Sequence, residues 1–316
     1  MGKDLDVLYQ RALDVPMQIV PWAPLNDRGI KLIIRRDDLI DPYQSGNKFY
    51  KLFYNLLAAK ERGIPQLLSF GGAYSNHLYA LAAAGHTAGV RTVGVVRGER
   101  PTILSPTLQD AEAWGMKLCF VSRSEYRADK AGLLESLKKT CGDFLLVPEG
   151  GANLDGARGA AAMGWAVTTR LGNAFDTVCV PCGTGSTLAG IASALPAGKT
   201  AIGFSVLKGE GGLGREIVRM YQACLSLNPG MDVGAHWRLI TGYHGGGYAR
   251  KLPSVLQTFW HDFEAETGIL LDPVYSLKMF WGIAQLAAQG YWKPGTRLVA
   301  VHTGGLQGRR GFLPEV

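Results

Sequence analysis

The chain has 316 residues, of which 47% are hydrophobic and 19% are charged, so its composition is that of an ordinary globular protein with one or two domains. The net charge of +7 suits an anionic ligand. The basic residues are scattered along the chain, and the charges of the Arg-Arg-Asp-Asp run at 35–38 cancel one another, so we expect no nucleic-acid partner. Five cysteines do not form a disulfide framework, and no apolar run approaches the ~18 residues of a membrane span, so we expect a cytoplasmic protein that does not enter the membrane.

Short apolar runs alternate with amphipathic or alanine-rich segments along almost the whole chain. The runs predict strands, and the segments between them predict helices, the first of which begins near Asn47 and ends at Gly63. This alternation is typical of parallel sheets that helices cover on both faces, so the predicted fold class is α/β. The predicted strands are 31–35, 66–70, 91–97, 116–122, 144–148, 177–181, 200–207, 237–241 and 297–302, and the later helices include 75–88, 105–114, 154–171, 186–195 and 254–267.

The first predicted helix raises a question about Lys48. The apolar residues between 49 and 57 recur at helical spacing, Asn47 is the predicted N-cap, and Lys48 would then be the first helical residue. The positive end of the helix dipole and burial both disfavour an ammonium there and lower its pKa. Such a lysine is a candidate amine nucleophile for a carbonyl, and a solvated surface lysine is the alternative.

Three glycine-rich loops follow predicted strands, where α/β sheets bind ligands. The loop 183–187 suits a single phosphate monoester, because it lacks the lysine of a Walker A motif and the glycine spacing of a dinucleotide fingerprint; a turn with a Ser/Thr helix cap is the alternative. Ser75 and Asn76 suit a small carboxylate or merely cap a helix, and His77 is either an acid–base residue or structural. In the third loop, 300–308, the residues Thr303, Gly304 and Gly305 either approach a ligand or end a strand.

Cys179 and Cys182 form a Cys-x-x-Cys motif in an apolar run. No second cysteine pair completes a zinc site, so we interpret the two residues as a buried structural pair and expect no metal site.

A phosphate loop without a metal, a carboxylate loop and a lysine with a lowered pKa together predict pyridoxal 5'-phosphate as the cofactor. Its aldehyde would react with Lys48, and its phosphate would bind the loop 183–187.

The order and spacing of seven motifs point to one family. They are SGNKFYKL (45–52), SFGGAYSNH (69–77), EGGAN (149–153), GTGSTLAG (183–190), GYARKLP (247–253), LLDPVYSLK (270–278) and HTGG (302–305). With them the chain resembles the pyridoxal-phosphate enzymes of the tryptophan-synthase-β-like fold, in the branch of 1-aminocyclopropane-1-carboxylate deaminase and D-cysteine desulfhydrase. The resemblance implies two open, twisted, mostly parallel sheets with helices on both faces, usually in a homodimer. Residues 1–48 and 162–316 would form the large cofactor-binding domain, and 49–161 a small inserted α/β domain.

The same resemblance implies roles for single residues. Lys48 would bond the cofactor's aldehyde, Asn76 its phenolic oxygen, and Ser75 the substrate carboxylate while assisting proton transfer near Lys48. Tyr275 would lie against the pyridine ring and, with Tyr248, make acid–base or leaving-group contacts; core packing is the alternative for both. The remaining cofactor-binding residues implied are Gly183, Thr184, Gly185, Ser186 and Thr187 at the phosphate, with Ser276 and Thr303.

Ser276 and Thr303 also indicate the reaction. In the family, the cyclopropane deaminase has a glutamate and a leucine at these positions. A carboxylate keeps the pyridine nitrogen protonated, whereas a hydroxyl leaves it largely neutral, which suits loss of a β-substituent better than opening of a cyclopropane. We therefore predict a lyase that converts D-cysteine to pyruvate, hydrogen sulfide and ammonia.

Other functions stay open. L-Cysteate, which would lose sulfite, and 1-aminocyclopropane-1-carboxylate are the alternative substrates. Phe49 and Tyr50 replace the usual threonine and arginine after the lysine, which leaves the exact substrate open. Alternatives from other classes are a non-catalytic protein that binds the cofactor or a phosphorylated metabolite, and a nucleotide-dependent oxidoreductase.

Overall fold

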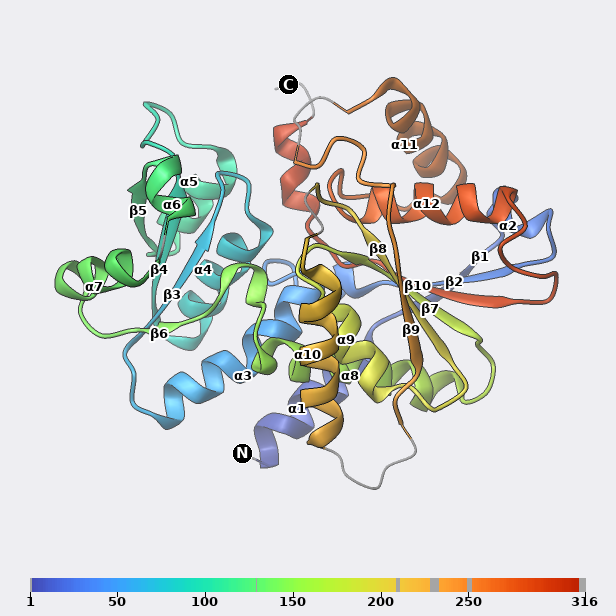
Figure 1. Ribbon diagram of the computed structural model, residues 1–316, viewed down its shortest axis with the longest axis horizontal. Helices are drawn as coiled ribbons and strands as arrows, with labels where there is room; N and C mark the ends of the chain where they lie inside the picture. Colours follow the sequence, from blue (N-terminus) through green and yellow to red (C-terminus); the bar gives the residue numbers. More distant parts are fainter. Residues whose placement is uncertain (1, 129, 209–210, 228–232, 249–251, 313–316) are drawn as a thin grey trace.

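The computed structural model describes residues 2–128, 130–208, 211–227, 233–248 and 252–312. Their strands form two separate sheets, one of six strands and one of four, with helices on both faces of each (Figure 1). The predicted α/β class with two mostly parallel sheets is confirmed.

The six-stranded sheet has the order β1-β2-β10-β7-β8-β9. β1 and β2 pair antiparallel, and all other neighbours pair parallel. The sequence did not predict β1, because Val20 is its single buried residue and no apolar run marks it. The bounds are Met17–Val20 for β1, Lys31–Arg35 for β2, Thr177–Cys182 for β7, Thr200–Ser205 for β8, His236–Ile240 for β9 and Arg297–Val301 for β10.

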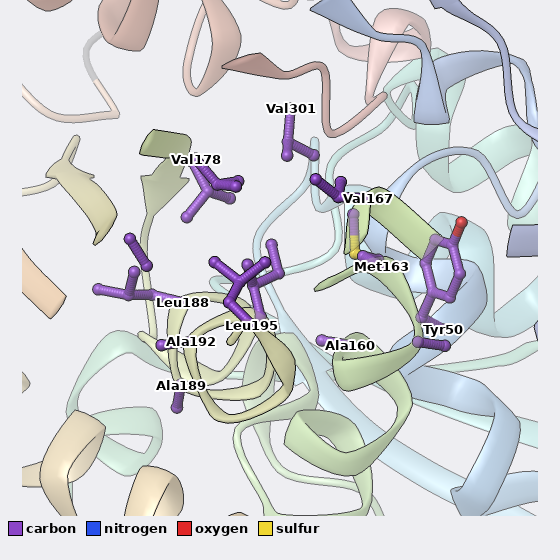
Figure 2. Close-up of a cluster of buried hydrophobic side chains, with 14 of the residues drawn as sticks. Tyr50, Ala160, Met163, Val167, Val178, Leu188, Ala189, Ala192, Leu195 and Val301 are labelled. Atoms are coloured by element: carbon purple, nitrogen blue, oxygen red, sulfur yellow. The ribbon is translucent and has the colours of Figure 1, made fainter. Parts of the chain in front are cut away.

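Two hydrophobic clusters cover the two faces of this sheet. The first joins α1 (Gly2–Asp14), α8 (Leu154–Leu171), α9 (Ser186–Ala194) and α10 (Leu213–Ser226), and Figure 2 shows its α8 and α9 side chains packed near Val178 and Val301. The second joins α2 (Ala23–Asn26), α11 (Ser254–Thr267) and α12 (Ser276–Ala288). Cys182 belongs to the first cluster and Cys179 to the second, so both are buried as predicted but lie on opposite faces rather than as a pair.

The four-stranded sheet has the order β5-β4-β3-β6, and all its strands are parallel. One face packs on α3 (Asn47–Glu61), α4 (Asn76–Ala88) and α5 (Pro106–Ala113), and the other on α6 (Arg123–Arg127) and α7 (Lys130–Cys141). The strands are Gln66–Gly71 for β3, Arg91–Arg97 for β4, Lys117–Val121 for β5 and Leu145–Leu146 for β6; the short 3-10 helices are η1 (Asp37–Leu39), η2 (Glu149–Gly151) and η3 (Leu306–Gly311).

α3 joins the cores of the two sheets. Tyr50 and Tyr54 belong to the cluster of the large sheet (Tyr50 is labelled in Figure 2), whereas Leu52 and Ala59 belong to that of the small sheet. The predicted domain boundaries cut through α3 and α8, and the division into 1–48 with 162–316 and 49–161 stays a prediction.

The start of α3 differs from the prediction. Gly46, not Asn47, is the N-cap, so Lys48 is the second helical residue. Gly46 has φ +70°, and a Cβ there would lie 1.8 Å from the carbonyl oxygen of Thr303, which leaves room for glycine alone. Asn47 is held elsewhere: its N–H donates to the Thr303 carbonyl (3.3 Å) and its Nδ2 donates to Thr187 Oγ1 (2.9 Å). The N-cap prediction was wrong because Asn47 ties two distant loops to the start of the helix.

Candidate active site

A cavity of about 370 Å³ lies at the carboxyl ends of β3 in the small sheet and β7 in the large sheet. This is the edge at which α/β sheets bind ligands. Most of the predicted site residues line it: Lys48, Ser75, Asn76, Gly183, Thr184, Gly185, Thr187, Tyr248 and Tyr275.

Three predicted site residues do not line the cavity. The Ser186 hydroxyl is fully buried and donates to the carbonyl of Gly151 (3.2 Å). The Ser276 hydroxyl accepts from the Asp272 N–H (2.8 Å) and is likewise fully buried. Thr303 is buried, and its carbonyl accepts from Asn47. The loop 302–305 therefore holds the start of α3 rather than lining the cavity.

The loop between β7 and α9 presents hydrogen-bond donors at the cavity. Gly185 is the N-cap of α9, with φ +80°, so the first N–H groups of the helix follow directly on the loop. Thr184 and Thr187 line the cavity, and the Thr187 hydroxyl is already an acceptor for Asn47. Helix N–H groups and hydroxyls at a positive dipole end are the donors that a phosphate monoester requires.

The loop after β3 starts α4 and supplies a second polar wall. Ser75 is the N-cap, and its Oγ accepts from the N–H of Leu78 (3.2 Å). Asn76 accepts a hydrogen bond from the Gln307 side chain, which fixes the amide. His77 Nε2 lies 2.9 Å from Ser69 Oγ, whereas its Nδ1 is buried without a hydrogen-bond partner in the described part of the chain.

A second lysine, which the sequence analysis missed, lies beside Lys48. Lys51 Nζ donates to the carbonyl oxygen of Gly150 (3.0 Å), and Lys48 Nζ makes a longer contact with the same oxygen (3.5 Å). Burial lowers the pKa of Lys48 to about 8, while burial and the neighbouring Lys48 lower the pKa of Lys51 well below its usual value. The sequence signal was present in the i, i+3 spacing, which places both amines on one helix face.

Two tyrosines close another side of the cavity. The hydroxyls of Tyr248 and Tyr275 lie 2.8 Å apart, so one donates to the other. Burial and the neighbouring Tyr248 raise the pKa of Tyr275 well above its usual value, so its hydroxyl stays protonated. Residues 249–251, which follow Tyr248 in its motif, lie outside the described residues.

Arg97 and Glu149 also line the cavity and were not singled out from the sequence. Arg97 ends β4, and its guanidinium lies over the Tyr126 ring at 5.7 Å from the centroid. Glu149 begins η2, next to the Gly150 carbonyl that both lysines face. The sequence signals available were the position of Arg97 at the end of a predicted strand and that of Glu149 at the start of the EGGAN motif (149–153).

Phe49 and Tyr50 do not line the cavity. The Tyr50 hydroxyl donates to Asp37 Oδ1 (2.6 Å) and accepts from Arg35 (2.9 Å) inside the core. Arg35 pairs with Asp37 in turn, and Arg36 pairs with Asp38, so the predicted cancellation of charge at 35–38 is confirmed. The unusual residues after Lys48 therefore shape the packing of α3 and not the wall that a substrate would touch.

Comparison with known proteins identifies the family. The model of the family described as pyridoxal-phosphate dependent enzyme matches residues 15–304. The chain belongs to this family. The pyridoxal-phosphate enzyme is 30% identical over 318 residues to the mitochondrial bifunctional D-cysteine desulfhydrase/1-aminocyclopropane-1-carboxylate deaminase of Arabidopsis thaliana, covering 93% of this chain and 77% of that one. It is also 28% identical to a putative 1-aminocyclopropane-1-carboxylate deaminase of Pyrococcus abyssi, covering 93% of this chain and 90% of the relative.

A solved structure agrees with the sequence relatives. The crystal structure of an ACC deaminase homologue superposes with a TM-score of 0.78 at 27% identity, covering 93% of this pyridoxal-phosphate enzyme and 90% of the other chain. The resemblance to the deaminase and desulfhydrase branch is thereby confirmed, as are the tryptophan-synthase-β-like fold, the lyase class and pyridoxal phosphate as the cofactor.

The cavity fits this cofactor on its own chemistry. An aldehyde needs a neutral amine, and burial lowers the pKa of Lys48 to about 8. A phosphate needs N–H and hydroxyl donors, which the start of α9 supplies. The buried Nδ1 of His77 is a further polar atom without a protein partner in the described residues.

Within the described residues, no helix is long and apolar enough to cross a membrane. The same residues contain no group of three or more metal-ligating side chains that could hold an ion.

Proposed function

We propose that this enzyme eliminates the β-substituent of an amino acid, with D-cysteine as the substrate. Water and D-cysteine would give pyruvate, hydrogen sulfide and ammonia. The name of the Arabidopsis relative, which includes D-cysteine desulfhydrase, supports this substrate.

The observation that carries the proposal is the start of α12. Ser276 stands where the cyclopropane deaminase has a glutamate, and its hydroxyl is engaged with the Asp272 backbone. The Asp272 carboxylate is itself occupied by the N–H groups of Val274, Tyr275 and Ser276. No carboxylate from this segment lines the cavity, and Glu149 lines it from η2 instead. A pyridine nitrogen without a carboxylate partner favours elimination over opening of a cyclopropane.

When bound, the cofactor supplies an aldehyde for amines and a ring that accepts negative charge from the α-carbon. In the proposal, Lys48 bonds the aldehyde, the residues 183–187 hold the phosphate, and Asn76 bonds the phenolic oxygen. Ser276 and Thr303 support this site from behind the cavity wall, since neither lines it.

The remaining steps fall to side chains of this chain. Ser75 would bind the substrate carboxylate, and the Lys48 amine would take the α-proton. The hydroxyl pair of Tyr248 and Tyr275 donates a proton toward the leaving sulfur. The homodimer and the cytoplasmic location stay predictions.

L-Cysteate is a second candidate substrate because of Arg97. Its guanidinium lines the cavity, and no carboxylate in the described ranges forms an ion pair with it. A sulfonate on the β-carbon would meet a cation there, and the products would be pyruvate, ammonia and sulfite. 1-Aminocyclopropane-1-carboxylate remains a candidate because the names of the relatives include its deaminase.

The test combines a spectrum with a substrate panel. The purified protein should show an absorption band near ~410–430 nm from the lysine-bound cofactor, and Lys48→Ala should lose it together with turnover. The kcat/KM for sulfide release from D-cysteine should exceed the kcat/KM for turnover of L-cysteine, L-cysteate or 1-aminocyclopropane-1-carboxylate. Faster opening of the cyclopropane would overturn the assignment, and a band without turnover on any of them would favour a non-catalytic binding protein.

A further inference from the structure

Two thiols face each other in the part of the molecule built around the small sheet. All five cysteines lie among the described residues, and all are free. Cys119 on β5 and Cys141 at the end of α7 are 22 positions apart in the chain, yet their Sγ atoms are 4.0 Å apart. Cys179 and Cys182, which form the Cys-x-x-Cys motif, lie on opposite faces of the large sheet. The fold has therefore brought together a pair of thiols that the sequence motif does not indicate.

Hydrogen bonds to the backbone hold the two segments beside each other. Lys117 of β5 donates from Nζ to the carbonyl of Thr140 (3.1 Å), the residue before Cys141. Gln66 of β3 donates from Nε2 to the carbonyl of Cys141 itself (2.6 Å). An S–S bond of about 2.05 Å would require the sulfur atoms to approach by about 2 Å, which is within the reach of a change in side-chain rotamer.

Both thiols are accessible to a small reagent, but they differ as nucleophiles. Each is partly exposed, whereas the other three cysteines are buried. Burial and the neighbouring Cys141 raise the pKa of Cys119 to about 11, and Lys117 opposes this rise. A thiol with so high a pKa is a poor first nucleophile, so Cys141 is the one to attack first. Once Cys141 is bonded to another sulfur it carries no charge, and its effect on the pKa of Cys119 disappears.

We propose that Cys119 and Cys141 are a modification site that closes to an intramolecular disulfide when the protein meets a low-molecular-weight disulfide such as oxidised glutathione. The Cys141 thiolate attacks one sulfur of the small disulfide, whose S–S bond breaks, and one small thiol leaves. Cys119 then gives its proton to solvent and attacks Sγ of Cys141, which expels the second small thiol. Two protein thiols are oxidised and one small disulfide is reduced to two thiols, so no other oxidant is consumed.

The site is separate from the cavity, since neither cysteine lines it, and it does not depend on the proposed function. The bond would fasten β5 to the end of α7 and enclose the segment that holds α6. Tyr126 of α6 lies under the guanidinium of Arg97, which lines the cavity, and packs against Phe70 at a ring-centroid distance of 5.7 Å. The cross-link would therefore restrain a segment that contacts the cavity wall.

The test treats the reduced, full-length protein with oxidised glutathione under native conditions. The remaining thiols are then blocked with N-ethylmaleimide during unfolding, and the peptides are mapped without reduction. We expect a chain lighter by two hydrogen atoms, in which Cys119 and Cys141 are linked and Cys179, Cys182 and Cys224 are alkylated. Glutathione retained on the wild type, a bond between Cys179 and Cys182, a bond between two chains, or no reaction would each overturn the proposal.

Two variants test the order of the steps. Cys119→Ser should retain glutathione at Cys141, because the thiol that would release it is gone. Cys224→Ala, which removes a buried cysteine elsewhere, is the matched control and should still form the bond. A Cys119→Ser protein without glutathione, beside a Cys141→Ser protein that carries it, would contradict attack by Cys141.

Thermal unfolding tests whether the bond fits the native fold. A disulfide restricts the unfolded chain, so the oxidised wild type should have a Tm about 5 °C above that of the reduced protein. The same treatment should not raise the Tm of Cys119→Ser. An equal or lower Tm of the oxidised wild type would show that the bond distorts the segments it joins, which would contradict a site formed by the native fold.

Discussion

Tyr248 and Tyr275 form a pair of hydroxyls, 2.8 Å apart, at the cavity wall. Tyr248 is 56% exposed, whereas Tyr275 is largely enclosed, so the proton of the pair has a route to solvent through Tyr248. Tyr275 stays protonated because its pKa is raised by burial and by Tyr248. Tyr275 can therefore give its proton to the substrate while it receives one from Tyr248, and Tyr248 takes a replacement proton from solvent, so both hydroxyls are protonated at the end of the transfer.

Tyr248→Phe should lower kcat for D-cysteine about 100-fold and change KM much less, because a general acid acts in the transition state. Steady-state kinetics at pH 7 to 9 would measure both constants. Tyr291→Phe, an exposed tyrosine outside the cavity, is the matched control and should retain activity. A loss confined to KM would assign the Tyr248 hydroxyl to substrate binding instead.

Sequence reasoning placed those candidate site residues whose position follows from the backbone. Lys48, Ser75 and Thr187 lie at helix starts, and helix starts can be read from caps and periodicity. It could not tell that the Ser186 hydroxyl turns to Gly151, because the direction of a side chain depends on loop dihedrals. Lys51 was missed for a related reason: periodicity shows a helix face, but not that two lysines on it face the Gly150 carbonyl.

At the level of elements, α3 is positioned by a close contact with α8. Gly159 of α8 meets the backbone of α3, where an added Cβ would lie 1.9 Å from the carbonyl oxygen of Tyr50. The contact lies two residues beyond Lys48 on the same helix. The spacing of α3 and α8 therefore sets how deeply the Lys48 amine enters the cavity.

Gly159→Ala should force α3 away from α8, with a loss of stability of about 1–3 kcal/mol and weaker retention of the cofactor. Urea unfolding and the absorption band after dialysis would measure the two effects. Gly132→Ala is the matched control, since Gly132 lies in α7 with open space around its Cα, and it should be neutral or stabilising by up to about 1 kcal/mol. Equal effects of the two substitutions would show that helix propensity, not contact, decides the outcome.

The strands and helices themselves were largely predictable. β2, β3, β4 and β7 begin at the predicted residue, because their apolar runs are bounded by polar or turn residues. The assignment of strands to two sheets was not in the periodicity and came from the resemblance to a family. β1 was not predicted, because an edge strand with one buried residue has no apolar run.

At the scale of the whole molecule, burial lowers the pKa of three lysines among the described residues, and two of them, Lys48 and Lys51, line the cavity. Besides Lys48 and Lys51, the fully buried Lys278 donates to the carbonyls of Val206 (3.1 Å) and Gly247 (2.6 Å), which fixes the segment before Tyr248. Burial lowers the pKa of Lys278 to about 8. A lysine whose pKa is lowered by burial reduces the stability of the fold at neutral pH.

The loss of stability caused by burying Lys51 can be tested by unfolding the cofactor-free chain. Its folded-state pKa is well below the usual value of 10.5, so between the two values the unfolded chain binds more protons than the folded chain. Stability therefore rises with pH through this window, and the penalty from Lys51 is present in full below the folded-state pKa and disappears above pH 10.5. Lys51→Met removes the penalty at every pH.

Lys51→Met should therefore have a higher Tm than the wild type at pH 7, and the difference should shrink as the pH approaches 10. Thermal unfolding followed by circular dichroism at pH 7, 8, 9 and 10 would measure it, with Lys60→Met as an exposed control that should stay within about 0.5 kcal/mol of the wild type throughout. A lower Tm at pH 7 would mean that Lys51 stabilises the fold through its bond to Gly150. A difference that is constant with pH would assign the gain to packing of the methionine, because only an ionisable group can make stability depend on pH in this window.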